Sequence, residues 1–187
     1  MEIQRMTTLI LFLSQLHANA KEEEYQTDLD FSIKGIQTNE APTKYAIKRL
    51  HSGGKKLDRI IAFVTLEAEN SAFAHYLNTI EAYCKKEKIH CPVIQSVRIP
   101  DSVEISELLQ KLIDSVFPFD EKDSIIIETT GGYRNAIHAF TLFARFLHYL
   151  NIRTEFSTFS DYQKKTVTTT NDHGYTWRGC FCRFQPA

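Results

Sequence analysis

The stretch from Ile125 to Phe140 reads IIIETTGGYRNAIHAF, and it decides the fold of this chain. Its first three residues are β-branched and apolar, which is typical of a strand buried on both faces. Two threonines and two glycines follow, and an arginine then precedes a helix-like pattern. Glycines let the backbone approach a ligand closely, and the first turn of a helix offers unpaired N–H groups and a partial positive charge. The stretch therefore predicts a strand–turn–helix unit whose turn binds an anion, usually a phosphate.

Strand-like and helix-like patterns alternate along the rest of the chain. Besides the strand at 124–129, we expect strands at 7–14, 58–65, 93–99 and 154–160. We expect helices at 41–50, at about 70–88, from the Pro100–Asp101–Ser102 opening to Val116, and after the glycine turn. This alternation predicts an α/β fold: a Rossmann-like, doubly wound, mostly parallel sheet with a C-terminal β-hairpin, in a single domain over residues 1–187.

Three segments carry more specific expectations. The polar stretch from Gln15 to Glu40 reads as a solvated loop that is mobile without ligand and folds partly over the site. The closing hairpin is expected to pair 164–170 with 175–184 across a turn at 171–174. The helix after the glycine turn has an apolar set that we expect to face the sheet: Ile137, Phe140, Leu142, Phe143, Phe146, Leu147 and Leu150.

The composition excludes several classes of protein. The chain has 187 residues, of which 43% are hydrophobic and 24% charged, as in soluble globular proteins. A net charge of −1 gives no overall basic surface for duplex nucleic acid or an anionic membrane, so any anion site must be local. Residues 1–20 have the outline of a secretory signal, but Ser14 and Gln15 interrupt a short apolar run, which favours a buried first strand. The four cysteines show no disulfide spacing, and we expect a cytoplasmic protein.

The topology selects candidate site residues. Ligands of open α/β sheets bind outside the carboxyl ends of the strands, where the strand order reverses. Arg134 could bind phosphate oxygens with two parallel hydrogen bonds, and Asn135 could contact a sugar or base edge. No G-x-G-x-x-G fingerprint or Walker A loop occurs, so no nucleotide cofactor is expected. The candidate ligand-binding set is Ser14, Gln15, Thr65, Glu67, Thr129, Thr130, Gly131, Gly132, Tyr133, Arg134 and Asn135.

The run from Glu128 to Arg134, ETTGGYR, resembles the acid-x-Thr-Gly-Gly-x-Arg/Lys signature of the CARF domain, the CRISPR-associated Rossmann fold. Aspartate is commoner than glutamate at its first position. The resemblance covers most of the chain, including a first strand that ends at Ser14 and a second that leads into Thr65. It implies a homodimer that binds cyclic oligoadenylate, the second messenger of type III CRISPR antiviral immunity, in a pocket at the dimer interface. Cyclic tetra-adenylate suits a two-fold dimer, which presents two identical glycine turns.

Three functions remain open at this stage. The first is a ring nuclease without metal or other cofactor, in which Arg134 stabilises the developing charge while Ser14 and Thr130 orient the attacking 2′-hydroxyl. The second is a non-cleaving sensor domain of a larger effector. The third is a metal-dependent nuclease that uses carboxylates after the strands, such as Glu67, Glu69, Asp101 and Glu128.

Overall fold

The computed structural model describes residues 5–117, 123–131 and 134–170, apart from the side chains of Arg134 and Asn135. Eight strands form one sheet in the order β3-β2-β8-β7-β6-β1-β4-β5. The strands are β1 (Thr7–Phe12), β2 (Glu23–Thr27), β3 (Ser32–Gly35), β4 (Arg59–Val64), β5 (Val93–Arg98), β6 (Ser124–Glu128), β7 (Arg153–Asp161) and β8 (Thr166–Thr170). The helices are α1 (Glu40–Ser52), α2 (Leu66–Ala68), α3 (Ala74–Glu87), α4 (Ile105–Val116) and α5 (Arg134–Tyr149), and a π-helical turn, η1 (Glu69–Phe73), joins α2 to α3.

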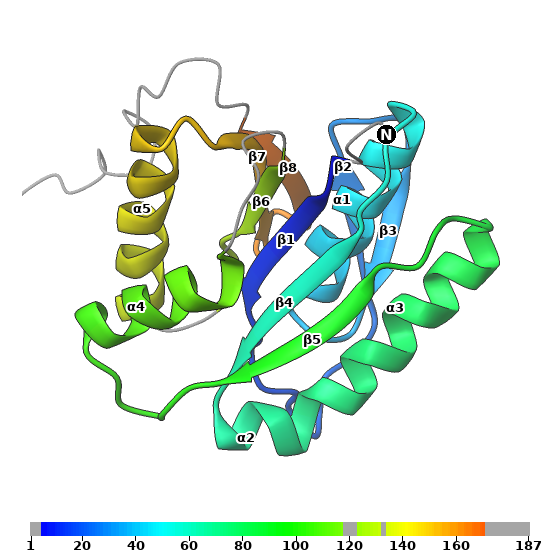
Figure 1. Cartoon of the computed structure of the whole chain (residues 1–187). Helices are drawn as coiled ribbons and strands as arrows, with labels where there is room; N and C mark the ends of the chain where they lie inside the picture. The colour runs from blue at the N-terminus through cyan, green and yellow to red at the C-terminus, as the bar shows by residue number, and fades with distance from the viewer. Residues whose placement is uncertain (1–4, 118–122, 132–133, 171–187) are drawn as a thin grey trace, which may run out of the picture.

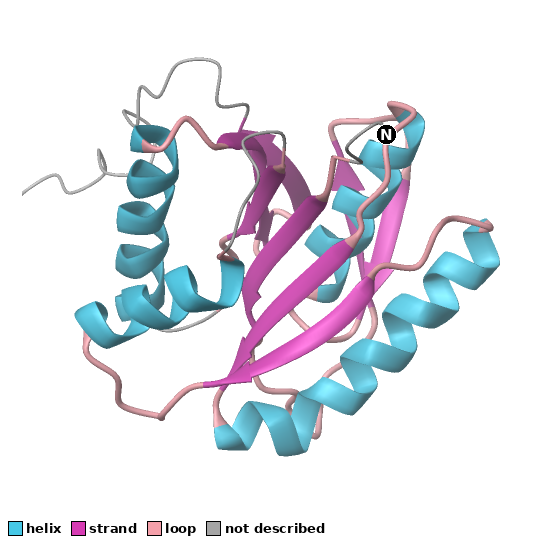
Figure 2. Ribbon diagram, in the orientation of Figure 1, coloured by secondary structure: helices cyan, strands magenta, loops and turns pink. Residues whose placement is uncertain are grey.

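The centre of the sheet is parallel. Strands β7, β6, β1, β4 and β5 pair in parallel, with β1 between β6 and β4. Among these parallel strands, β1 is followed along the chain by β4 on one side, and β6 is followed by β7 on the other, so their order reverses between β1 and β6. Helices α1 and α3 cover one face of the sheet, and α4 and α5 cover the other (Figures 1 and 2). The predicted Rossmann-like, doubly wound α/β fold is confirmed.

Strand β1 is buried along its whole length, because both faces of the sheet are covered. Leu9 and Leu11 belong to the core beneath α1 and α3, whereas Ile10 and Phe12 pack in the core beneath α4 and α5. This is the arrangement expected for a continuous apolar run in a parallel sheet. The predicted buried first strand is therefore present at the centre of the fold.

The interpretation of Gln15–Glu40 as a solvated loop is wrong. This stretch contains β2 and β3, an antiparallel pair that extends the sheet through parallel pairing of β2 with β8. Tyr25 and Ile33 are buried against Tyr45 of α1 and Val167 of β8. Each of the two strands buries few side chains and leaves its polar neighbours in solvent, so the stretch looks polar in sequence. Pairing within the sheet is also incompatible with a mobile lid made from the whole segment.

In the C-terminal hairpin, strand β8 has a different partner from the one predicted. Strand β8 pairs antiparallel with β7, across a turn at residues 162–165. The expected partner at 175–184 lies outside the described residues. The C-terminal hairpin of the described residues is therefore β7–β8, and β8 pairs in turn with β2.

Two helices differ in detail from the prediction. Helix α4 begins at Ile105 rather than at Pro100, since Glu104 before it is still extended, with φ −66° and ψ 147°. On α5, Ile137 and Leu142 are each 44% exposed instead of facing the sheet. The prediction considered only large apolar side chains, whereas three alanines form part of the buried face of α5. The buried side chains of α5 are Ala136, Ala139, Phe140, Phe143, Ala144 and Leu147.

Across the described ranges, none of the helices is both long enough and apolar enough to cross a membrane.

Candidate functional site

A pocket of about 330 Å³ opens beyond the carboxyl ends of β1, β4 and β5. Phe12, Phe63 and Ile99 give it an apolar floor, and neutral polar side chains form much of the remaining wall. Three of the predicted residues line it, namely Ser14, Gln15 and Thr65. His17 and Thr38 also line it and were not in the candidate set.

The glycine turn packs against the end of β1 beside this pocket. A Cβ atom at Gly131 would lie 2.5 Å from Asn39 Nδ2, 2.8 Å from Ser14 Oγ, and closer still to the Phe12 carbonyl oxygen. Real side chains do not tolerate such contacts, so only glycine fits at this position. Ser14 lines the pocket and also lies against Gly131. Helix α5 begins at Arg134, three residues after Gly131. The predicted strand–turn–helix unit is therefore present at the carboxyl end of the sheet.

The two threonines of the turn tie it to β7. Thr129 donates twice to the Thr158 carbonyl oxygen, from its backbone N–H at 3.0 Å and from its hydroxyl at 3.2 Å. The Thr130 hydroxyl instead accepts from the Ser160 N–H at 2.8 Å. Since the Thr129 proton is used within the fold, this residue is a structural tie. The Thr130 side chain also hydrogen-bonds to the Glu128 carboxylate, so both threonines tie the turn to its surroundings.

Asn39, which was not predicted, joins the turn to β1. Its side chain is fully buried, and its Oδ1 accepts from the Ser14 N–H at 2.9 Å and from Gln37 Nε2 at 2.8 Å. Its Nδ2 donates to the Phe12 carbonyl oxygen at 3.1 Å and to the carboxylate of Glu128. An asparagine before a helix usually caps that helix, but here it makes no capping bond and bridges strands β1 and β6 instead. That role depends on contacts distant in the chain, so no local pattern could have indicated it.

Glu128 lies behind the turn rather than in the pocket. It is fully buried and accepts from the Thr130 N–H at 2.6 Å and from Asn39. Burial raises its pKa to about 7, although these hydrogen bonds act in the opposite direction. The acid of the signature therefore holds the backbone of the turn in place, and its carboxylate faces protein.

A second buried carboxylate orders the segment that carries Asn39. Glu40 accepts from the backbone N–H groups of Ile36 and Gln37, each at 3.1 Å. Lys44 Nζ lies 3.1 Å from it, and His75 Nε2 of α3 lies 2.7 Å from it. These contacts fix residues 36–40 against α1 and α3, and through Asn39 they fix one side of the glycine turn.

The other predicted residues lie at the pocket edge, on α2, at the start of α5, or outside the described residues. Thr65 lines the pocket, but its hydroxyl also caps α2 by accepting from the Ala68 N–H at 3.2 Å. Glu67 is exposed on α2 and does not line the pocket. Arg134 and Asn135 are the first residues of α5. Gly132 and Tyr133 lie outside the described residues, as do the side chains of Arg134 and Asn135.

The four carboxylates proposed for a metal do not form a cluster. Glu69 pairs with Arg98, Glu128 is buried behind the glycine turn, and Glu67 and Asp101 are exposed. Within the part of the chain that the structure describes, no group of three His, Cys, Asp or Glu side chains could hold a metal ion. The arrangement instead combines a neutral pocket, a close-packed glycine turn and a helix start.

A scan of the chain against protein-family models finds no matching family, and a search of curated proteins finds no matching sequence.

Proposed function

We propose that the chain binds cyclic oligoadenylate, cyclic tetra-adenylate foremost, at the carboxyl end of its sheet and cleaves it without a metal. The observation that carries this proposal is the packing of Gly131 against the end of β1, which brings the glycine turn and the start of α5 beside the pocket. The resemblance of the turn to the CARF signature supplies the class of ligand. The position of the turn beside the pocket supports a phosphate site at the turn and a base in the pocket.

The lining of the pocket suits a purine nucleoside. Its floor of two phenylalanines and an isoleucine is apolar, as the face of a base requires. Ser14, Gln15, Thr38 and Thr65 place neutral donors and acceptors around that floor, where base edges and ribose hydroxyls need partners. A charged wall would favour a different ligand, and His17 is the one titratable side chain among the described residues that line the pocket.

The size of the pocket supports a dimer. Its volume of about 330 Å³ is at the lower end of the roughly 300–1,000 Å³ typical of ligand pockets. One pocket is thus proportionate to one nucleotide of the ring rather than to the whole ring. In a two-fold homodimer, two copies of the pocket and of the glycine turn would face opposite halves of one cyclic ligand.

The proposed cleavage is an internal transfer that needs no metal. A ribose 2′-oxygen forms a bond to the adjacent phosphorus while the bond from phosphorus to the next 5′-oxygen breaks. The proton lost by the 2′-hydroxyl is balanced by the proton gained by the leaving 5′-oxygen, and the product ends in a 2′,3′-cyclic phosphate. Ser14 and Thr130 would hold the attacking group in line, and Arg134 would stabilise the negative charge that grows on the phosphate.

The test is incubation of the full chain with cyclic tri-, tetra- and hexa-adenylate in the presence of EDTA, followed by chromatography and a separate binding assay. Cleavage in EDTA with a 2′,3′-cyclic phosphate product supports the proposal. Binding without cleavage limits the function to a sensor. Cleavage that EDTA abolishes identifies a metal-dependent nuclease, and the absence of both binding and cleavage overturns the proposal.

A further inference from the structure

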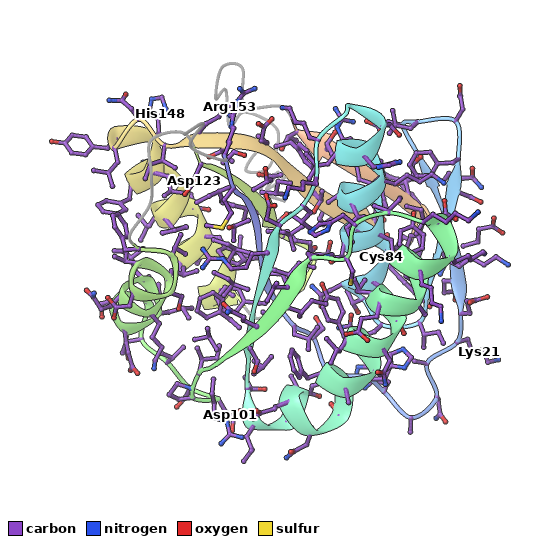
Figure 3. The ribbon with its side chains drawn as sticks, turned by 45° about the vertical axis from the view of Figure 1, so that its right-hand side comes forward. Lys21, Cys84, Asp101, Asp123, His148 and Arg153 are labelled. Atoms are coloured by element: carbon purple, nitrogen blue, oxygen red, sulfur yellow. The ribbon has the colours of Figure 1, made fainter. Side chains whose placement is uncertain are left out.

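The amino end of the sheet carries a cluster of charged side chains that the proposed function does not use. We define the amino-end cluster as the cations Arg5, Lys55, Lys56 and Arg153 with the carboxylates Asp58 and Glu155. Three of the cations contact Glu155, with Arg5 at 3.4 Å, Lys55 at 3.0 Å and Arg153 at 3.5 Å. Lys56 pairs with Asp58 at 2.8 Å. Arg153 and Asp101, labelled in Figure 3, mark the opposite ends of the sheet.

A β-bulge places Glu155 at the centre of the cluster. The pairing of β7 with β6 matches Thr154 to Ile125 and then Phe156 to Ile126, so Glu155 has no partner on β6. In a regular strand, consecutive side chains point to opposite faces, yet Glu155 and Phe156 line the same cavity. Bulges redirect single side chains in this way and are over-represented beside functional sites. The carboxylate that gathers three cations is therefore positioned by a specific departure from strand geometry.

The charges of the cluster are unequal in number and in exposure. Four cations oppose two carboxylates, which leaves a surplus of two positive charges in a chain whose net charge is −1. The cationic side chains are 42–48% exposed, whereas Glu155 is 7% exposed and Asp58 16%. A molecule that approaches this end therefore meets the cations first, while the carboxylates beneath them hold the cations together.

Two cavities flank Lys55. One of about 600 Å³ is lined by Arg5, Lys56 and His51, and the other, of about 220 Å³, is lined by Arg49 and Arg153. Lys55 and Glu155 line both cavities. The turn after α1 delivers the two lysines, and Gly54 in this turn has φ 69°, a conformation that side chains other than glycine rarely adopt.

We infer that the amino-end cluster binds a ligand that carries at least two phosphate groups. Lys55 lines both cavities, and each cavity is also lined by arginine. One phosphate could therefore bind in each cavity, with Lys55 between the two. Exposed arginine and lysine are the usual partners of phosphate oxygens. Two sources share this chemistry, namely a nucleoside di- or triphosphate and the backbone of a single-stranded nucleic acid.

The test is an NMR titration of the full chain with inorganic pyrophosphate at low salt. We expect amide shifts at Gly53–Lys56 and Arg153–Glu155, and weaker binding at high salt. Orthophosphate should bind more weakly than pyrophosphate, because it occupies only one of the two positions. A short single-stranded RNA and ADP then distinguish the sources. Tighter binding of ADP at these amides identifies a nucleotide ligand, and tighter binding of the RNA identifies a single-stranded nucleic acid.

Variants decide whether the cluster itself is responsible. Lys55→Ala and Arg153→Ala should each weaken pyrophosphate binding about tenfold, the effect of losing one charge-assisted hydrogen bond. Lys85→Ala, which removes an exposed lysine from the end of α3, should leave binding unchanged. Pyrophosphate that shifts no amide of the cluster would overturn the inference. Binding that survives Lys55→Ala, or that falls equally in Lys85→Ala, would also overturn it.

Discussion

The two ends of the sheet are built on different physical principles. At the carboxyl end, buried hydrogen bonds and a close backbone approach fix the glycine turn beside a pocket lined by neutral polar and apolar side chains together with His17. At the amino end, exposed cations surround shielded carboxylates in open cavities. At the carboxyl end, an added atom at Gly131 should lower the free energy of unfolding strongly, because it meets backbone and a buried side chain. At the second end water screens the charges, so single losses should cost little and should depend on salt.

The largest expected effect is that of Gly131→Ala. The added Cβ would overlap Ser14 Oγ, the Phe12 carbonyl oxygen and Asn39 Nδ2, and the last two are hydrogen-bonded to each other in the buried network. We expect the free energy of unfolding to fall by about 3 kcal/mol, at the upper end of the usual cost of overpacking. Urea unfolding measures this change.

Gly53→Ala is the matched control for this variant. A Cβ at Gly53 would lie 3.5 Å from its nearest atom, the Leu50 carbonyl oxygen, and the backbone has an ordinary φ of −86°. We expect a change of less than about 1 kcal/mol. Equal losses in the two variants would show that the approach at Gly131 is not as close as the structure indicates.

The second prediction concerns the pH dependence of stability and Glu128. Its folded pKa of about 7 is above its unfolded value, so between these pKa values the folded state binds one more proton than the unfolded state. This contribution to stability is complete below the unfolded pKa and is lost as the pH rises through 7, with a slope of roughly 1.4 kcal/mol per pH unit. Glu128→Gln cannot titrate, so its unfolding free energy should fall less than that of the wild type between pH 5 and pH 7.

Urea unfolding of both proteins across this range isolates the titration. A constant offset from the altered hydrogen bonds of the glutamine would leave the difference in slope unaffected. Parallel curves for the two proteins would mean that Glu128 is already ionised in the fold at pH 5.

The third prediction tests the proposed phosphate site. Arg134→Ala should weaken cyclic oligoadenylate binding by roughly 1.5–3 kcal/mol per site, the range for a charge-assisted hydrogen bond, with little change in folding. Arg134→Lys should recover part of the affinity, since lysine keeps the charge but loses the paired geometry. If the ring is cleaved, the single-turnover rate at saturating ligand should fall further, because the charge grows toward the transition state.

Arg145→Ala is the control for Arg134, because Arg145 is an exposed arginine on the same helix. Titration calorimetry with cyclic tetra-adenylate compares the two variants. Unchanged affinity in Arg134→Ala would remove the phosphate role of the glycine turn. An equal loss in both variants would indicate a general effect of positive charge on α5.

Features set by local sequence could be predicted, whereas features set by pairing of distant segments could not. The stretch 125–140 predicted a buried strand, a tight turn and a helix, because each depends on local preferences. Ser14, Gln15 and Thr65 were found by a rule about strand ends, and all three line the pocket. Asn39 and the bulge at Glu155 were missed, since both depend on pairing between distant segments. Strands β2 and β3 were missed because a strand with one buried face places few apolar residues in sequence.

The smallest expected effect is at the amino end. Lys55 contacts a well-shielded carboxylate at 3.0 Å, but its own side chain is 43% exposed, so water and salt screen the pair. We expect Lys55→Ala to lower the free energy of unfolding by less than about 1 kcal/mol at low salt and by even less at high salt. Arg5 and Arg153 still contact Glu155 in this variant, which therefore leaves no buried charge unpaired.

Urea unfolding at two salt concentrations measures this effect. A loss above 2 kcal/mol that salt does not change would show that the amino-end cluster is a buried ion network like the one around Glu40, and the contrast between the two ends would fail. A small, salt-sensitive loss has a consequence for binding. Cations held weakly by Glu155 can turn to a phosphate at little cost in stability, which is the property that a ligand site at this end requires.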